Sequence, residues 1–196
     1  VELVGRVAGL QAPCAGVDAE AYLLVECAGR AGVVDRVSAQ LDQGTVSGIV
    51  DVAVATDATR RAALWRYREE HTPLFPTVGV AHKVAGTVAL GARAECHACV
   101  RVVVAGRAEG VRVWLFGHLG DGNIHVNVTG LDGPQLDGEW LEDLHVDDAV
   151  LAYVAELGGS ISAEHGIGNA KVGALHLRRS PAEVATMRAI RVALDP

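Results

Sequence analysis

The segment "VRVWLFGHLGDGNIHVNVTG", residues 111–130, decides the fold of this chain of 196 residues. "VRVWLFGH" and "NIHVNVTG" have the pattern of two strands that face each other across a loop. Gly120 and Gly122 allow the backbone to turn sharply between these strands. Strands that are joined by so short a turn run antiparallel. The segment therefore predicts a hairpin within an antiparallel sheet.

The patterns around this hairpin mix strands and helices. Strand patterns occur at 21–29 and 48–56, a strand pair is expected across 77–90, and a short strand begins the segment 160–171. Helical spacing predicts helices at 31–43, 58–71, 90–109, 140–159 and 181–196, with a polar loop at 131–140. We expect Asp57 to cap the second of these helices and Pro73 and Pro76 to end it. This order predicts an α+β domain, an antiparallel sheet with helices on one face.

The composition limits the classes of protein to which the chain can belong. Half of the residues are apolar, and the length suits one good-sized domain or at most two small ones. A net charge of -7 without a basic stripe argues against a nucleic-acid partner. The sequence has neither a long apolar run of the kind that spans a membrane nor a secretory signal. Because it begins at Val1 and stops at "ALDP", we expect a piece of a longer protein.

The four cysteines, Cys14, Cys27, Cys96 and Cys99, are too few and too scattered for a disulfide scaffold. They favour a reducing, cytoplasmic setting. Cys96 and Cys99 form the motif "CHAC", which could bind a metal or act in redox chemistry. The surrounding stretch "LGARAECHACVRVVVAGRAEG" has the pattern of a helix packed on an apolar face. We favour this helical interpretation over a metal or redox site.

Two histidines flank the turn of the hairpin. His118 ends the first strand and His125 lies near the start of the second, so the two should face each other across the mouth of the turn. Asn127 shares a face with His125, because side chains alternate along a strand. Two imidazoles and a carboxamide in one small volume form half of a site for zinc or a similar divalent ion. The alternative is a hairpin whose histidines cap loop carbonyls.

A second segment, "SAEHGIGNAK" at 162–171, adds Glu164 and His165 at the end of the short strand. A carboxylate with two histidines makes a set of three metal ligands that leaves positions open for a substrate. A further histidine beside such a set is positioned for proton transfer. The alternatives are a capping or surface carboxylate for Glu164 and an exposed loop residue for His165.

Together, "GHLGDGNIHVNV" and "GGSISAEHGIGNAK" resemble the C-terminal, substrate-binding half of FAD-linked 2-hydroxy-acid dehydrogenases. That family includes D-2-hydroxyglutarate dehydrogenase, D-lactate dehydrogenase and the FAD subunit of glycolate oxidase. The resemblance runs across essentially the whole chain, and it implies a single cap domain over residues 1–196. The implied fold is an antiparallel sheet flanked by helices, as in the flavoproteins related to vanillyl-alcohol oxidase. FAD would be bound mainly by a separate N-terminal domain.

The resemblance also assigns roles to residues of the two motifs. His118, His125 and Glu164 match the family's ligands for a divalent metal, usually zinc. His165 matches the base that takes the proton from the substrate hydroxyl, and Asn127 matches an amide that contacts the substrate.

Further upstream, Trp65, Arg68 and Thr72 meet the family pattern of a tryptophan, an arginine three residues on and a threonine four after that. The resemblance implies that Arg68 holds the substrate carboxylate in a bidentate pair, with Thr72 beside it. Lys83 falls where the family has a lysine that also binds acidic groups of the substrate. The alternatives are ordinary solvated charges for Arg68 and Lys83 and a helix terminus for Thr72.

The chain differs from the family pattern after Lys83 and at its two ends. After its lysine the family often has an acidic residue and then a proline, where this chain has Ala85 and Ala89. These changes put the strand after Lys83, and with it the substrate preference, in doubt. The family also continues beyond "ALDP" and has a flavin domain before this region, while no segment here could cradle a dinucleotide. We therefore expect this chain alone not to bind FAD tightly.

The reaction that the resemblance implies is oxidation of a D-2-hydroxy acid, such as lactate, glycolate or 2-hydroxyglutarate, to the 2-oxo acid. His165 would accept the hydroxyl proton beside the metal, and the flavin would accept the hydride. Lys83 hints at a second carboxylate on the substrate, and the residues identify no electron acceptor. Two other functions stay open: a stand-alone metallohydrolase, and a module that binds a metal or carboxylates without catalysis.

Overall fold

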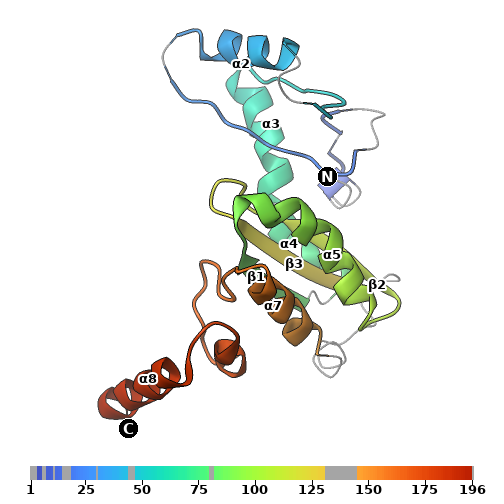
Figure 1. The fold of residues 1–196 in the computed structure, drawn as a ribbon. Helices are drawn as coiled ribbons and strands as arrows, with labels where there is room; N and C mark the ends of the chain where they lie inside the picture. Colours follow the sequence, from blue (N-terminus) through green and yellow to red (C-terminus); the bar gives the residue numbers. More distant parts are fainter. Residues whose placement is uncertain are drawn as a thin grey trace. The chain divides into compact units, whose positions relative to one another are not determined.

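The computed structural model describes residues 4–5, 8–10, 12–14, 19–29, 31–43, 47–79, 82–130 and 145–195. They fall into two compact units, Val1–Thr77 and Val78–Pro196 (Figure 1). That all 196 residues act as a single cap domain stays a prediction. The polar loop predicted at 131–140 lies outside the described residues.

The first unit contains three described helices: α2 (Val33–Asp42), α3 (Ala58–Glu69) and α4 (His71–Val78). The predicted helix at 31–43 is confirmed by α2, and the helix after Asp57 is confirmed by α3. Asp57 caps α3 as expected, because its carboxylate accepts a hydrogen bond from the Arg60 amide at 2.8 Å.

The prediction that Pro73 and Pro76 end this helix is wrong. The helix α3 already ends at Glu69, and both prolines lie inside α4. Pro73 stands in the first turn of α4, where an amide hydrogen would have no partner within the helix. Pro76 is further inside and removes one helical hydrogen bond from this short element.

The strands predicted at 21–29 and 48–56 are also wrong. Neither segment pairs as a strand with any described residue. Their apolar side chains are exposed, among them Leu23 and Val25 in the first segment and Val50 and Val54 in the second. Alternating β-branched residues favour an extended backbone, but a strand forms only where a neighbour supplies the ladder of hydrogen bonds.

The second unit is built on a three-stranded antiparallel sheet with the order β1-β3-β2. Its strands are β1 (His82–Thr87), β2 (Val111–Phe116) and β3 (Asn123–Gly130). The predicted hairpin at 111–130 is confirmed by the pairing of β2 with β3. The strand pair predicted across 77–90 is wrong, because α4 extends to Val78 and the described residues of this range form one strand, which pairs with the distant β3.

Helices cover one face of this sheet, so the predicted α+β architecture is confirmed (Figure 1). The 3-10 helix η1 (Leu90–Ala92) leads into α5 (Arg93–Ala105), and α7 (Val146–Glu156) packs beside α5. The predicted helices at 90–109 and 140–159 are thereby confirmed within the described residues. The core between sheet and helices is formed by alternate residues of β1 and β3 and by one side of each helix: Val84, Ile124, Val126, Val128, Cys96, Val100, Val104, Val150 and Val154.

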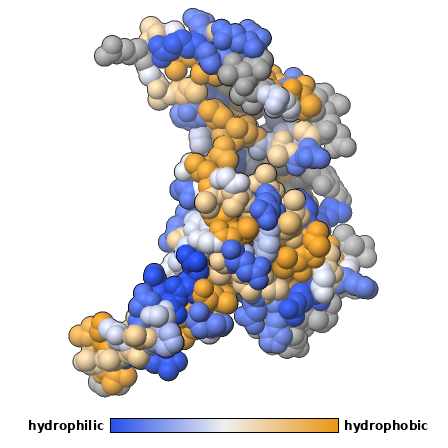
Figure 2. Space-filling model, in the orientation of Figure 1, coloured by the Kyte–Doolittle hydropathy of each residue, from blue (hydrophilic) through white to orange (hydrophobic). Residues whose placement is uncertain are grey.

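The short strand predicted at the start of 160–171 is wrong. In this segment a single residue, Ser160, pairs with Thr87 of β1 as an isolated bridge. The chain continues through η2 (Val172–Leu177) to α8 (Pro181–Leu194), which confirms the last predicted helix. Ser180 and Glu183 form a capping box at its start. Apolar side chains of α8 are exposed, notably Ile190 and Leu194. Figure 2 shows apolar surface on this helix. No described helix is both long enough and apolar enough to cross a membrane.

Candidate active site

The face of the sheet opposite α5 and α7 carries polar and aromatic side chains. Ile124 and Val126 of β3 point into the core, so His125 between them points to the opposite face. The antiparallel register places on this same face the neighbours of His125, namely Ala85 and Phe116, and those of Asn127, namely Lys83 and Trp114. A chain reversal and two strand pairings thus gather several of the predicted site residues on one surface.

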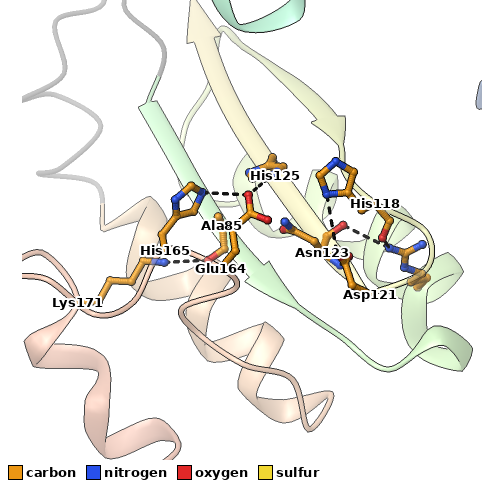
Figure 3. Close-up of polar contacts among 9 residues, drawn as sticks. Ala85, His118, Asp121, Asn123, His125, Glu164, His165 and Lys171 are labelled. Atoms are coloured by element: carbon orange, nitrogen blue, oxygen red, sulfur yellow. Dashed lines mark hydrogen bonds and ion pairs between the residues drawn. The ribbon is translucent and has the colours of Figure 1, made fainter. Parts of the chain in front are cut away.

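His125, Glu164 and His165 form a compact group on this face (Figure 3). Oε1 of Glu164 lies 3.7 Å from Nε2 of His125 and 3.6 Å from Nε2 of His165. One donor atom from each residue can be chosen so that all three lie within 4.8 Å of one another. The His125 side chain is 17% exposed, while those of Glu164 and His165 are 50% and 58% exposed. The group is therefore anchored on the sheet and open to solvent on its loop side.

Aromatic contacts fix the orientation of the His125 ring. The ring of Phe116, its partner in the register, stacks on it with centroids 4.9 Å apart. The ring of His165 approaches it edge-on at 5.8 Å. Such contacts restrict ring rotation, so the Nε2 atom of His125 is held facing Glu164.

A strained turn presents Glu164 and His165 to the sheet. Ser160 exchanges backbone hydrogen bonds with Thr87 at 2.8 and 2.9 Å, which fixes the start of the segment at the edge of β1. Ala163 then adopts a φ of 47°, a left-handed conformation that costs a non-glycine residue about 1 kcal/mol or more. Gly166 and Gly168 take the same region of φ without that cost. The segment can therefore turn twice within a few residues and direct the carboxylate at His125.

His118 lies in the turn of the hairpin, outside the group of three. Its Nδ1 atom is 3.8 Å from Oδ2 of Asp121. Oδ1 of Asp121 accepts a hydrogen bond from the Asn123 amide at 3.0 Å. The turn is also bound from the helix side, because Nη2 of Arg93 donates to the carbonyls of His118 and Asn123. Among the described residues, the structure thus brings together two of the three predicted metal ligands, with His165 in the place next to them.

The other predicted residues divide between the two units. Lys83 and Asn127 lie directly opposite each other, on the same face as His125. Trp65 and Arg68 belong to α3 and Thr72 to α4 of the first unit, so their part in the site stays a prediction.

Two buried polar residues on β3 were not predicted as site residues from the sequence. Asn123 and Thr129 share the face of His125 and Asn127, and both are buried. The side-chain atoms Nδ2 and Oδ1 of Asn123 and Nδ2 of Asn127 have no hydrogen-bond partner among the described residues. Thr129 accepts a hydrogen bond from the indole of Trp114 at 2.9 Å. The alternation in "NIHVNVT" is the signal that could have identified them, since it places every second residue on one face.

The donor set of the group fits a divalent metal. Two imidazoles and one carboxylate are ligands that zinc, manganese and iron accept. The described strands form one antiparallel sheet and no parallel βαβ unit of the kind that cradles a dinucleotide. Cys96 and Cys99 lie on α5 as free thiols, with Cys96 buried in the core, which confirms the helical interpretation of "CHAC".

Comparison with known proteins finds relatives of this chain. The chain is 33% identical to the mitochondrial D-2-hydroxyglutarate dehydrogenase of Rattus norvegicus in an alignment that covers 100% of this chain and 36% of the relative. It is 32% identical to the Danio rerio protein of the same name over 89% of this chain and 32% of the relative. The D-2-hydroxyglutarate dehydrogenase of Stutzerimonas stutzeri is 43% identical over 43% of this chain and 18% of its own length.

The chain therefore spans about a third of the length of the first two relatives. The family model described as "FAD linked oxidases, C-terminal domain" matches residues 5–196. The motifs that carried the resemblance lie within this match, on the hairpin and in the segment after α7. The chain belongs to the family of C-terminal domains of FAD-linked oxidases.

Proposed function

We propose that this chain is the substrate-binding part of an FAD-dependent dehydrogenase that oxidises a D-2-hydroxy acid to the 2-oxo acid with the help of a divalent metal. The observation that carries the proposal is the group of His125, Glu164 and His165, whose donor atoms lie within 4.8 Å of one another. Lys83 and Asn127 on the same sheet face supply groups that suit a hydroxy-acid substrate.

For the metal we propose His118, His125 and Glu164 as ligands and zinc as the ion. His125 and Glu164 are also in the group that the geometry selects, whereas His165 stands there in place of His118. When bound, a divalent ion lowers the pKa of the substrate's 2-hydroxyl and stabilises the developing charge by several kcal/mol.

His165 is the proposed base. An imidazole can accept the proton of the 2-hydroxyl at Nε2, and the carboxylate of Glu164 at 3.6 Å stabilises the charged ring that results. Proton transfer by a positioned side chain contributes roughly 10²- to 10⁴-fold to the rate. Asn127 can hold the substrate by its side-chain amide, because Nδ2 is buried and lacks a hydrogen-bond partner among the described residues.

We propose that three residues bind the carboxylates of the substrate. Arg68 holds the 1-carboxylate as a bidentate pair, and Thr72 donates its hydroxyl beside it. Lys83 binds a second carboxylate, which favours a dicarboxylic acid over lactate or glycolate. The relatives from Rattus norvegicus and Danio rerio are named D-2-hydroxyglutarate dehydrogenases, so we propose a substrate of this kind.

The proposed partner is an FAD-binding domain of the same longer protein, and its FAD supplies the hydride acceptor. The residues of this chain do not identify the acceptor that reoxidises the flavin. We propose a reducing, cytoplasmic setting because the cysteines are free thiols. The two animal relatives carry the word mitochondrial in their names, and a mitochondrial matrix would suit free thiols equally.

Metal content of the 196-residue chain tests the ligand set. Elemental analysis should find about one zinc ion per chain, and His125→Ala and Glu164→Gln should lose it. We expect His118→Ala to lose the ion and His165→Ala to keep it. The opposite pattern for these last two variants would make His165 a ligand and remove it as the base.

Activity tests the reaction. The longer protein that contains this chain should reduce its FAD when D-2-hydroxyglutarate is added, and His165→Ala should abolish this bleaching while the FAD stays bound. Ester or amide hydrolysis by the 196-residue chain without FAD would point instead to a metallohydrolase. Zinc and carboxylate binding without any turnover would point to a binding module.

A further inference from the structure

Lys171 makes two hydrogen bonds that join the two halves of the group around Glu164. Its Nζ atom donates to the carbonyl of Ala85 on β1 at 2.9 Å and to the carbonyl of Ile161 at 2.8 Å. Figure 3 shows the ammonium reaching from the segment beyond His165 to the strand beside His125. The two acceptors lie on different segments of the chain, so one side chain bridges them.

The positions of the two acceptor carbonyls link this bridge to the group of His125, Glu164 and His165. Ala85 lies directly opposite His125 in the antiparallel register. Ile161 stands three residues before Glu164, and its side chain is buried in the core. The Thr87–Ser160 bridge also joins β1 to this segment, but it lies before the strained turn at Ala163. Lys171 closes the far side of that turn, so the loop carrying Glu164 and His165 is held at both ends.

The chemistry of lysine suits this position. Lys83 and Lys171 are the two lysines among the 17 basic residues, so arginine is the usual cation of this chain. An ammonium is a compact donor with three hydrogens, and it can reach two carbonyls that do not lie in one plane. Burial lowers the pKa of Lys171 below its usual range, an effect that the carboxylate of Asp147 opposes.

We propose that Lys171 is a positioning residue, whose bonds to the Ala85 and Ile161 carbonyls fix Glu164 and His165 against His125. The inference rests on the proposed function for the chemistry that these three residues perform. The two hydrogen bonds of Lys171 are observed in the structure. Their effect on the loop that carries Glu164 and His165 can be tested even if the chain binds no metal.

A purely electrostatic role for Lys171 would have the opposite effect on metal binding. Removal of a positive charge near a divalent cation should strengthen binding by reducing repulsion. Loss of a residue that orients the ligands should weaken it, by about 10- to 100-fold for interactions of this kind. The sign of the change therefore separates positioning from charge.

The test uses Lys171→Met in the 196-residue chain, with Arg188→Met on the exposed face of α8 as a control that removes one positive charge elsewhere. Hydrogen exchange is measured on peptides covering 161–168 and on peptides of the hairpin 111–130. Zinc affinity is measured by competition with a chelator. We expect faster exchange at 161–168, unchanged exchange in the hairpin, and zinc binding weakened by about 10- to 100-fold. Lys171→Arg, which keeps charged donors, should recover part of the affinity, and Arg188→Met should match the wild type.

Unchanged exchange at 161–168 in Lys171→Met would overturn the proposal, as would zinc binding that is equal or tighter. If the wild-type chain binds no zinc, the metal assignment fails by itself, and the exchange result still decides the role of Lys171. If Lys171→Met does not fold, Lys171→Gln is measured in its place with the same expected and contrary results.

Discussion

Ala85 of β1 lies directly opposite His125 of β3, so one of the smallest side chains of the sheet faces the histidine to which Glu164 is paired. The Ala85 side chain is buried, and its carbonyl accepts the hydrogen bond from Lys171. Glu164 and His165 approach His125 from a segment beyond β1, so the small residue at 85 leaves them room.

Replacement of Ala85 by leucine should therefore disturb the group without removing any of its members. The larger side chain would compete with Glu164 for the space beside His125, and we expect zinc affinity to fall by at least about 10-fold, as for the loss of an orienting contact. Ala85→Gly keeps the space and should retain the affinity. Both variants are compared by chelator competition after their melting temperatures have been recorded. Equal affinity in Ala85→Leu and the wild type would show that this space does not matter.

The parts of the fold that follow from local pattern could be predicted. The hairpin at 111–130 has its turn and alternation within one short segment, so sequence alone determines which residues share a face. Capping by Asp57 and the start of α8 at Pro181 are equally local. On the candidate site, the same local alternation was enough to place His125 and Asn127 on one face of the sheet.

The rest depends on contacts between distant residues. The segment 48–56 has as clear an alternation as β3, yet it forms no ladder with any described residue, because a strand needs a neighbour that sequence pattern does not identify. Lys171 and Ala85 are 86 positions apart, and no spacing rule connects them. The grouping of His165 with His125 depends likewise on how the segment after α7 returns to the sheet.

The turn of the hairpin should tolerate a methyl group at one glycine and not at another. A Cβ atom at Gly117 would lie 1.9 Å from the carbonyl oxygen of Asn123, whereas one at Gly120 would meet nothing within 4 Å. We expect Gly117→Ala to lower the free energy of unfolding by about 2 kcal/mol or more, since backbone must move. Gly120→Ala is the matched control and should change it by less than about 0.5 kcal/mol. Urea denaturation of both variants measures the difference, and equal stabilities would contradict the close packing of this turn.

Arg93 should matter to the same turn from the opposite side. Its guanidinium is buried and donates to the carbonyls of His118 and Asn123, and hydrogen bonds to a charged group contribute about 1.5–3 kcal/mol. Arg93→Met keeps much of the apolar stem but leaves both carbonyls without this donor. We expect an unfolding free energy lower by about 2 kcal/mol and faster hydrogen exchange at 117–123. An unchanged exchange rate in these peptides would mean that the turn is held by the Asp121 carboxylate and its glycines alone.

His71 should make the chain less stable in mild acid. Burial lowers the pKa of this imidazole to about 4, with a smaller contribution from the charge of Arg68, while an unfolded histidine titrates near 6.5. Between these values the unfolded chain binds more protons than the folded one, so the stability contributed by neutral His71 is present above about pH 6.5 and is lost as the pH falls towards 4. His71→Phe cannot be protonated, so its urea midpoint should fall less than that of the wild type between pH 7 and pH 4.5. His145→Gln, at an exposed histidine, controls for the general effect of acid and should follow the wild type. A His71→Phe midpoint that falls in parallel with the wild type would show that His71 is not held neutral by burial.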